Sequence, residues 1–372
     1  MSTTAEGGSA GETAVTPVVA ISVSDNETIA TTGTGSGVVA SDTITLSAQH
    51  AGSVTTVAEG STEAGNTGVG ISLALSIGTD IASATVARNL TAGGAIGLSA
   101  RNATSNSGKA KASVAGGDAE EAPEEGSADA EQGGVNKKVK GNRDYADNRA
   151  KANGADSDAP TTDKASAEGE GGSKVQVAGA PAVTITSATS RAKINDGLTI
   201  TAGSGTGVTD GTITIQSEAN ADSEAVADAS TVLEGEGGGS STGVGVAVSV
   251  DGAGIVHEAV LGDSTITADG VVVQALMAEV DGDSKHAFKA EATSGASGAE
   301  TGVAGALAIN VGLSRTHAKI ADNATVTITD DGAVELKAQN LVSNTVKATA
   351  KQEGGGSVGV GASIALNIGE TD

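Results

Sequence analysis

The chain of 372 residues contains no cysteine and no tryptophan, and it has one tyrosine, one phenylalanine and four prolines. Without cysteine, the protein can form neither disulfide bonds nor thiolate metal sites. Without aromatic rings, its core must be built from Ala, Val, Ile and Leu, which supply nearly all of the 38% hydrophobic residues. Glycine is abundant, at 55 residues, but the scarcity of proline excludes a collagen helix.

Basic residues are also scarce, because 21 Lys and Arg face 46 Asp and Glu, for a net charge of −25. Such a chain repels the phosphate backbone of nucleic acids and the anionic surface of a membrane, so we expect no nucleic-acid partner. No run of 18 apolar residues is present, so we expect no membrane insertion.

Five segments share an alternating pattern. They read TITLSAQ from Thr43, AIGLSAR from Ala95, TITIQSE from Thr212, GVVVQAL from Gly270 and AVELKAQ from Ala333. Their second, fourth and sixth positions are apolar or small, and the positions between them are mostly polar. A period of two predicts a half-buried β-strand.

A second, glycine-rich strand pattern opens each copy, at Val69, Val177, Val244 and Val303, with a fifth start at Val358. Each opening strand precedes another strand, with predicted inward pairs such as Ala192/Ile194 and Ala259/Leu261. Self-similarity at a fixed spacing indicates a solenoid, in which each copy buries its apolar side against the next. We therefore predict an all-β fold, a repetitive parallel β-helix (β-solenoid) with a roughly 59-residue repeat, interrupted by one long polar insertion.

Coils of about twenty residues would give three coils per copy, and two larger coils remain an alternative. At the ~4.8 Å spacing of paired strands, about 16 such coils would make a rod ~75 Å long. The ends of such a rod are open strand edges, so end-to-end self-association is expected.

The spacing fails once, since Ala100 to Val177 spans 77 residues whereas Ala275 to Val303 spans 28. The extra residues are charged and nearly free of aliphatics, and such a sequence cannot bury enough apolar surface to order itself. We predict a disordered N-terminal segment (1–13), solenoid repeats (14–115), a disordered charged loop (116–173) and further repeats (174–372). The insertion is a candidate interaction loop through Lys137, Lys138, Lys140, Arg143 and Tyr145.

Sites for chemistry are few. The four histidines fall in columns that we predict to face outward: His50, His257, His286 and His317. Acidic turn residues are weak candidates for calcium: Asp281, Asp283, Asp330 and Asp331. We expect no other cofactor and no catalysis, although paired carboxylates of a polysaccharide-active β-helix enzyme (Asp251, Glu258, Asp281 and Asp283) remain an alternative.

Threonine pairs recur at one position of the repeat: Thr199/Thr201, Thr265/Thr267 and Thr327/Thr329, with Asn89/Thr91 as a partial fourth. Outward threonine arrays are the device of ice-binding surfaces. One pair in every three coils would match ice poorly, so the β-propensity of threonine is the favoured explanation.

The segment GVAGALAINVGLSRTHAKIADNATVTITDDGAVELKAQ, from Gly302, resembles the repeats of very large bacterial surface proteins of the filamentous-haemagglutinin-like and autotransporter-adhesin-like class. The resemblance implies a secreted or surface-displayed β-solenoid stalk for adhesion or cell–cell contact, with glycans or proteins of another cell as partners. A calcium-dependent extracellular binding module is the main alternative. The first residues do not form a signal peptide, so we expect a fragment whose export signal lies elsewhere.

Overall fold

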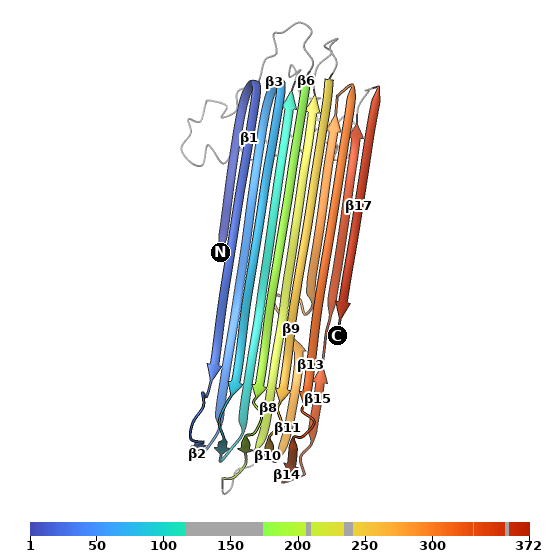
Figure 1. Ribbon diagram of the computed structural model, residues 1–372. Helices are drawn as coiled ribbons and strands as arrows, with labels where there is room; N and C mark the ends of the chain where they lie inside the picture. The colour runs from blue at the N-terminus through green and yellow to red at the C-terminus, as the bar shows by residue number, and fades with distance from the viewer. Residues whose placement is uncertain (117–173, 206–209, 234–240, 330, 354–356) are drawn as a thin grey trace.

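The computed structural model describes residues 1–116, 174–205, 210–233, 241–329, 331–353 and 357–372. In these ranges the regular structure consists of β-strands, arranged in one twelve-stranded and one five-stranded sheet (Figure 1). No helix in the described ranges is long and apolar enough to span a membrane. The strands are β1 (Ser2–Thr31), β2 (Val38–Ala40), β3 (Ile44–Val86), β4 (Leu90–Ala92), β5 (Ile96–Gly116), β6 (Lys174–Ile194), β7 (Thr199–Thr201), β8 (Thr212–Leu233), β9 (Ser241–Leu261), β10 (Thr265–Ala268), β11 (Gly270–Met277), β12 (His286–Ser297), β13 (Thr301–Ile320), β14 (Thr325–Ile328), β15 (Val334–Ala338), β16 (Val342–Glu353) and β17 (Val358–Thr371).

One coil of the solenoid consists of two long passes in opposite directions and one short strand. Strand β3 shows this, because its first half pairs with β5 up to Glu63, and its second half pairs with β6 from Thr67 onward. The chain therefore reverses direction near residues 64–66. The passes that follow such reversals form one wall (β1, β3, β6, β9, β13 and β17), and the passes that precede them form the facing wall.

Every ladder between named strands is parallel and joins a copy of the repeat to the next copy. Val177 pairs with Val244, and Val244 pairs with Val303, so one copy makes one coil. The expectation of three coils per copy is therefore wrong. The spacing between adjacent coils is not constant, since it is 52 residues from Ile44 to Ile96 and 67 from Val177 to Val244. The fifth opening strand aligns two residues later than predicted, with Val360 opposite Val303.

The large coil changes the expected proportions of the molecule. Strand β6 has 21 residues, which at ~3.3 Å each span ~69 Å. Six stacked passes at ~4.8 Å spacing span only ~29 Å. The described part is thus a slab whose long axis follows the strands, instead of a rod elongated along the stack. Uninterrupted alternation over about twenty residues leaves no corner at which a smaller coil could close.

The structure also differs from the expectation at the N-terminus. The predicted disordered segment 1–13 belongs to strand β1, whose residues Ser2–Gly11 pair with Thr55–Ala64 of β3. Its Glu6, Gly7 and Ala10 stand opposite Glu59, Gly60 and Glu63. These N-terminal residues therefore form a further half coil. Their sequence is only weakly apolar, but they are ordered because their backbone forms ladder hydrogen bonds with β3.

The core has two unlike parts. In the part nearer the reversals the buried cluster is almost entirely alanine, with Ala58, Ala110 and Ala227 stacked in one column. Side chains this small let the two walls approach closely. A Cβ added to Gly245 would lie 2.5 Å from the carbonyl oxygen of Gly295 on the facing wall. At this position even alanine would not fit without moving the backbone.

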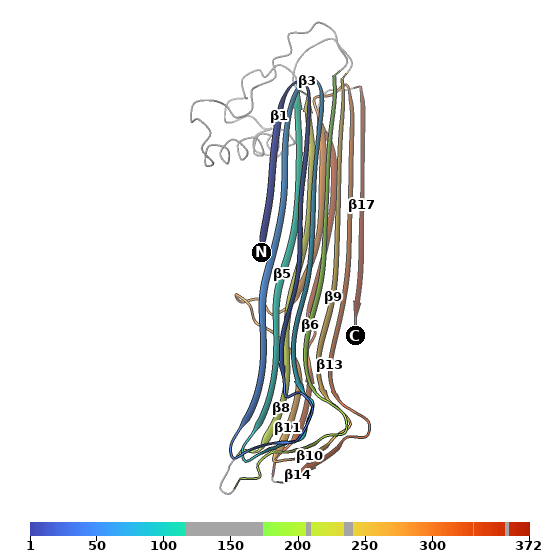
Figure 2. The same ribbon diagram turned by 60° about the vertical axis from the view of Figure 1, so that its left-hand side comes forward.

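At the opposite end the five short strands form a third wall, in the order β14-β10-β7-β4-β2. The strands spread apart at this end in Figure 2. The wider interior is filled by larger side chains, among them Leu98, Ile200, Ile213 and Ile266. The predicted inward pairs Ala192/Ile194 and Ala259/Leu261 are buried here, as the period of two indicated.

Candidate functional site

The calcium candidates do not come together. Asp281, which has a positive φ of 50°, and Asp283 lie in the turn between β11 and β12. Asp331 is exposed between β14 and β15, on the short-strand end, and Asp330 lies outside the described residues. Within the described ranges no three His, Cys, Asp or Glu side chains are grouped closely enough to hold a metal ion. Calcium binding by these residues therefore stays a prediction.

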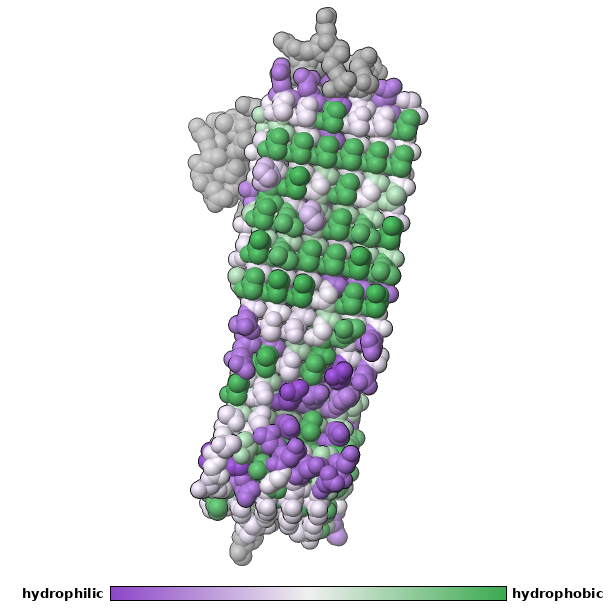
Figure 3. Space-filling view, in the orientation of Figure 1, coloured by the Kyte–Doolittle hydropathy of each residue, from purple (hydrophilic) through white to green (hydrophobic). Residues whose placement is uncertain are grey.

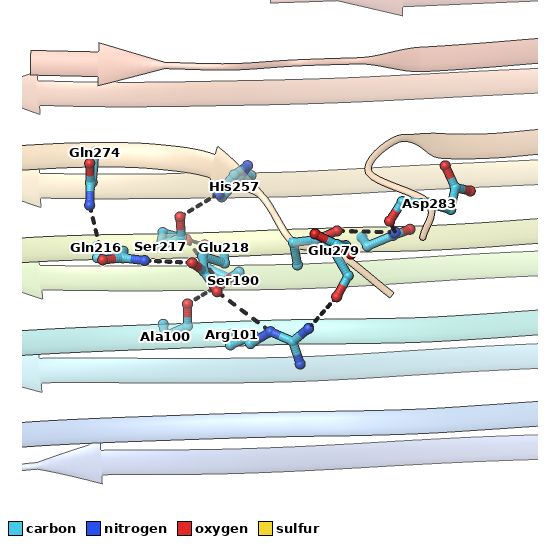
Figure 4. Close-up of polar contacts among 12 residues, drawn as sticks. Ala100, Arg101, Ser190, Gln216, Ser217, Glu218, His257, Gln274, Glu279 and Asp283 are labelled. Atoms are coloured by element: carbon cyan, nitrogen blue, oxygen red, sulfur yellow. Dashed lines mark hydrogen bonds and ion pairs between the residues drawn. The ribbon is translucent and has the colours of Figure 1, made fainter. Parts of the chain in front are cut away.

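The turn at Asp281 is instead held by ordinary polar contacts. The backbones of Val280 and Asp283 exchange two hydrogen bonds of 2.8 Å. The Nδ2 of Asn220 donates to the carbonyl oxygen of Asp283 at 3.1 Å, and Arg101 Nη2 donates to the carbonyl oxygen of Glu279 at 2.7 Å (Figure 4). These bonds fix the turn against β5 and β8.

The candidate interaction loop lies outside the described residues, so the structure does not place Lys137, Lys138, Lys140, Arg143 or Tyr145.

The candidate catalytic carboxylates are also separated. Asp251 faces the interior and is fully buried, whereas Glu258 faces outward and pairs with Arg191 at 2.8 Å. They are seven positions apart on one strand, an odd number, so their side chains lie on opposite sides of the wall. Within the described ranges neither belongs to a group of three metal-ligating side chains with Asp281 and Asp283.

Two of the four histidines are buried, which corrects the prediction that all face outward. His257 and His286 have no exposed surface, while His50 is 12% exposed and its Nε2 lies 2.9 Å from Asp80 Oδ1. His317 alone among them is well exposed, at 41%. The sequence contained the signal for His257, because His257 lies two and four positions before the predicted inward pair Ala259/Leu261. In a strand, residues at even spacing point to the same side.

The buried histidines belong to a polar layer between the alanine cluster and the wider aliphatic cluster. His257 Nε2 lies 2.9 Å from the carbonyl oxygen of Ser217, whose hydroxyl contacts Ser190 Oγ at 2.9 Å (Figure 4). His286 Nδ1 accepts a hydrogen bond from the backbone N–H of Ala221 at 3.0 Å. Burial lowers the pKa of His286 to about 4, and the proximity of His257 adds to this effect.

Asp251 occupies the same layer. Its Oδ1 accepts a hydrogen bond from Ser223 Oγ at 2.5 Å, and Thr186 Oγ1 donates to Ser223 Oγ at 2.8 Å. Burial raises the pKa of Asp251 to about 7 in spite of these hydrogen bonds. Asp251, His257 and His286 are sealed from solvent, so they can act on stability but cannot meet a substrate.

The outer surface of one wall is charged and cross-linked. Lys109, Glu224, Lys289, Glu291 and Lys347 alternate across β5, β8, β12 and β16, with ion-pair distances between 2.8 and 3.2 Å. The hydrogen bond from Lys347 lowers the pKa of Glu291. Such exposed pairs align neighbouring coils, although each contributes little stability by itself.

The outer surface of the other wall carries what we call the aliphatic face. It consists of every second residue, starting with the first, of the ranges 15–23, 69–77, 177–185, 244–252, 303–311 and 360–368. All thirty positions are Val, Ile, Leu, Ala, Pro or Gly, and none is buried. They form five parallel rows in Figure 3, with a polar zone on the same wall below them. Sequence reasoning missed this surface, because it did not assign the large residues of the opening strands to the outside.

The threonines of the short strands form two outward columns in the five-stranded sheet. Thr265 pairs with Thr199 and Thr325, and Thr267 pairs with Thr201 and Thr327. The predicted pair Thr327/Thr329 is therefore displaced by two residues, since Thr325/Thr327 is the aligned pair. The pair recurs on successive coils, which removes the argument that it is too sparse. The ice-binding alternative remains a prediction.

No protein-family model, no curated protein and no solved structure matches this chain.

Proposed function

We propose that this chain is a structural segment of a bacterial β-solenoid fibre, secreted or displayed on the cell surface, which supports adhesion or cell–cell contact without catalysis. The observation that carries the proposal is the parallel pairing of each coil with the next, from β1 to β17. Glycans or proteins of another cell are the partners that such a fibre would reach. The polar, variable residues of the outer surface are compatible with that role.

The mechanical argument follows from the size of the coil. Ladder hydrogen bonds join neighbouring strands, so in this stack they run from coil to coil along the stacking axis, with the slant of a parallel sheet. Strand β13 pairs with β9 through twenty successive residues, Thr301–Ile320. A force along the stack that is spread over the whole coil is therefore shared by this entire row of bonds. A wide coil makes each joint in the stack strong.

The closed interior adds to this strength. Alanine columns hold the two walls together at one end, and Ile and Leu columns fill the other. Between them, side chains such as Asn106, which donates to the carbonyl oxygen of Ile185 at 2.9 Å, link one wall to the other. The coils are thus joined both along the stack and across it.

Single-molecule force measurement on the full chain tests the proposal. A handle at each terminus would load the stack, and a shaft should release its coils one at a time. Between Val303 and Val360 a coil has 57 residues, so each release should lengthen the chain by roughly 200 Å. Unfolding in one event at low force, in the presence or absence of calcium, would contradict a structural role.

A further inference from the structure

The aliphatic face is larger than the apolar patch of an ordinary monomer. Each outward position on a sheet occupies ~6.6 Å along the strand and ~4.8 Å across it, so thirty positions cover ~950 Å². The largest apolar patch of a typical monomer is about 300–600 Å². Ile21, Ile71, Ile185, Val246 and Ile364 on this face are between 43% and 63% exposed. This exposure is not explained by folding of the single chain.

The face is also sharply bounded. None of its thirty positions carries a charge. Further along the same wall the outward residues are charged, for example Glu27, Arg191, Glu258 and Lys319. The facing wall carries the alternating Lys and Glu pairs on its outer surface. In a chain with a net charge of −25, an uncharged zone of this size and shape indicates a contact surface.

We propose that the aliphatic face binds the same face of a second copy of this chain. Two stacked sheets pack at about 10 Å with their strands roughly aligned, and a second copy supplies a sheet with the same twist and spacing. Burying ~950 Å² on each copy gives ~1,900 Å² in total, which is within the range of stable protein interfaces. The absence of charge on the face lets two copies of an acidic chain meet without repulsion at the contact.

The relief of the face supports a self-contact. The second row reads Pro17, Ile71, Gly179, Val246, Gly305 and Ala362 across the six coils, so large and small residues alternate. A two-fold axis parallel to the strands presents this row to itself in reversed order. Ile71 of one copy then opposes Gly305 of the other, and Val246 opposes Gly179. In this row the two large side chains, Ile71 and Val246, each meet a recess.

Charge insertion on a single strand tests the contact with a matched control. Ile21 and Ile29 both lie on β1 and face outward, with exposures of 51% and 54%, but only Ile21 belongs to the aliphatic face. In sedimentation velocity the wild-type chain should be dimeric. Ile21→Lys should weaken the dimer at least about tenfold, because a buried unpaired charge is costly. Ile29→Lys should leave the dimer unchanged.

A second pair of variants tests whether the large side chains of one copy fit into the recesses of the other. A Cβ added to Gly305 or to Gly254 meets no atom within 4 Å, so both glycines accept a larger residue within their own chain. Gly305 lies on the aliphatic face, whereas Gly254 lies outside it. Gly305→Val should weaken the dimer although it adds apolar surface, and Gly254→Val should not.

Three results would overturn the proposal. The first is a wild-type chain that stays monomeric at every concentration. The second is assembly beyond a dimer that Ile21→Lys leaves intact, which would indicate pairing through the open edges of β1 and β17. The third is flotation with neutral phosphatidylcholine vesicles that Gly305→Val strengthens, which would assign the face to lipid. None of these results bears on the release of coils under force, so the structural role would be judged separately.

Discussion

Replacing Asp251 with asparagine should make the stability of the protein much less sensitive to pH between about pH 4 and pH 7. The carboxyl group of Asp251 is fully buried in β9, and burial raises its pKa from 3.8 to about 7. In the unfolded chain the same group ionises near 3.8. The folded protein therefore binds one more proton than the unfolded chain between pH 4 and 7. The stability from this group is fully present below pH 3.8 and is lost as the pH rises through 7.

The size of the effect follows from the two pKa values. Each unit of pKa difference corresponds to ~1.4 kcal/mol, so the displacement from 3.8 to about 7 is worth about 4 kcal/mol. Asparagine does not titrate, and its Oδ1 can still accept the hydrogen bond from Ser223. The same column already holds an asparagine in the next coil, because Asp251 pairs with Asn310. The substitution is therefore compatible with the local geometry.

Urea unfolding followed by circular dichroism at a series of pH values measures the effect. The free energy of unfolding of the wild type, minus that of Asp251→Asn, should fall by about 4 kcal/mol between pH 4 and pH 8. Asn310→Asp is the reciprocal variant. It should add a further loss of unfolding free energy as the pH rises over the same range. A difference that does not vary with pH would show that the carboxyl group reaches water, and the reasoning from burial would be refuted.

Three further predictions use the same unfolding assay. His286→Asn should reduce the loss of stability between pH 6.5 and pH 4 by about 3 kcal/mol. The reason is that the unfolded histidine takes up a proton in this range, whereas the buried one, with a pKa of about 4, does not. The same loss of stability in the variant and the wild type would contradict this. Ala110→Leu should lower stability by about 1–3 kcal/mol, since the alanine cluster has no room for a larger side chain; a neutral effect would mean that the walls can separate. Gly298→Ala should cost roughly 2 kcal/mol, because φ is 74° and the new Cβ would collide with the carbonyl oxygen of Leu233; wild-type stability in this variant would show that the reversal is free to rearrange.

Much of the architecture could be read from the alternation alone. The predicted inward pair Ala192/Ile194 and the repeated columns at Ile96 and Ile213 are buried and paired in register. Parity fixes which residues share a side of a strand, because successive side chains point to opposite faces. Parity also placed His257 beside Ala259, although its polarity suggested the outside. For His257, the polarity of the side chain was therefore a weaker guide to burial than its position in the alternating pattern.

The size of the coil was decided by tertiary structure. A spacing near 59 residues fits one, two or three coils equally well in sequence, because strand periodicity does not record where the chain turns. The register of Val244 with Val303 settles the choice in favour of one coil. The same register orders the N-terminal residues, since their pairing with β3 depends on a neighbour and not on their own composition.

The sequence by itself determined that the chain is all-β, that its copies stack in parallel, and which residues share each face of a strand. In the opening strands, only the tertiary structure decided which face lies inside. In the opening strand VGISLALSI, Val69, Ile71 and Leu73 point outward while Gly70, Ser72 and Ala74 point inward. The facing wall presents alanines such as Ala58 and Ala110, so the gap between the walls admits only small residues. The large side chains are therefore left on the surface, where we propose that they meet a second copy.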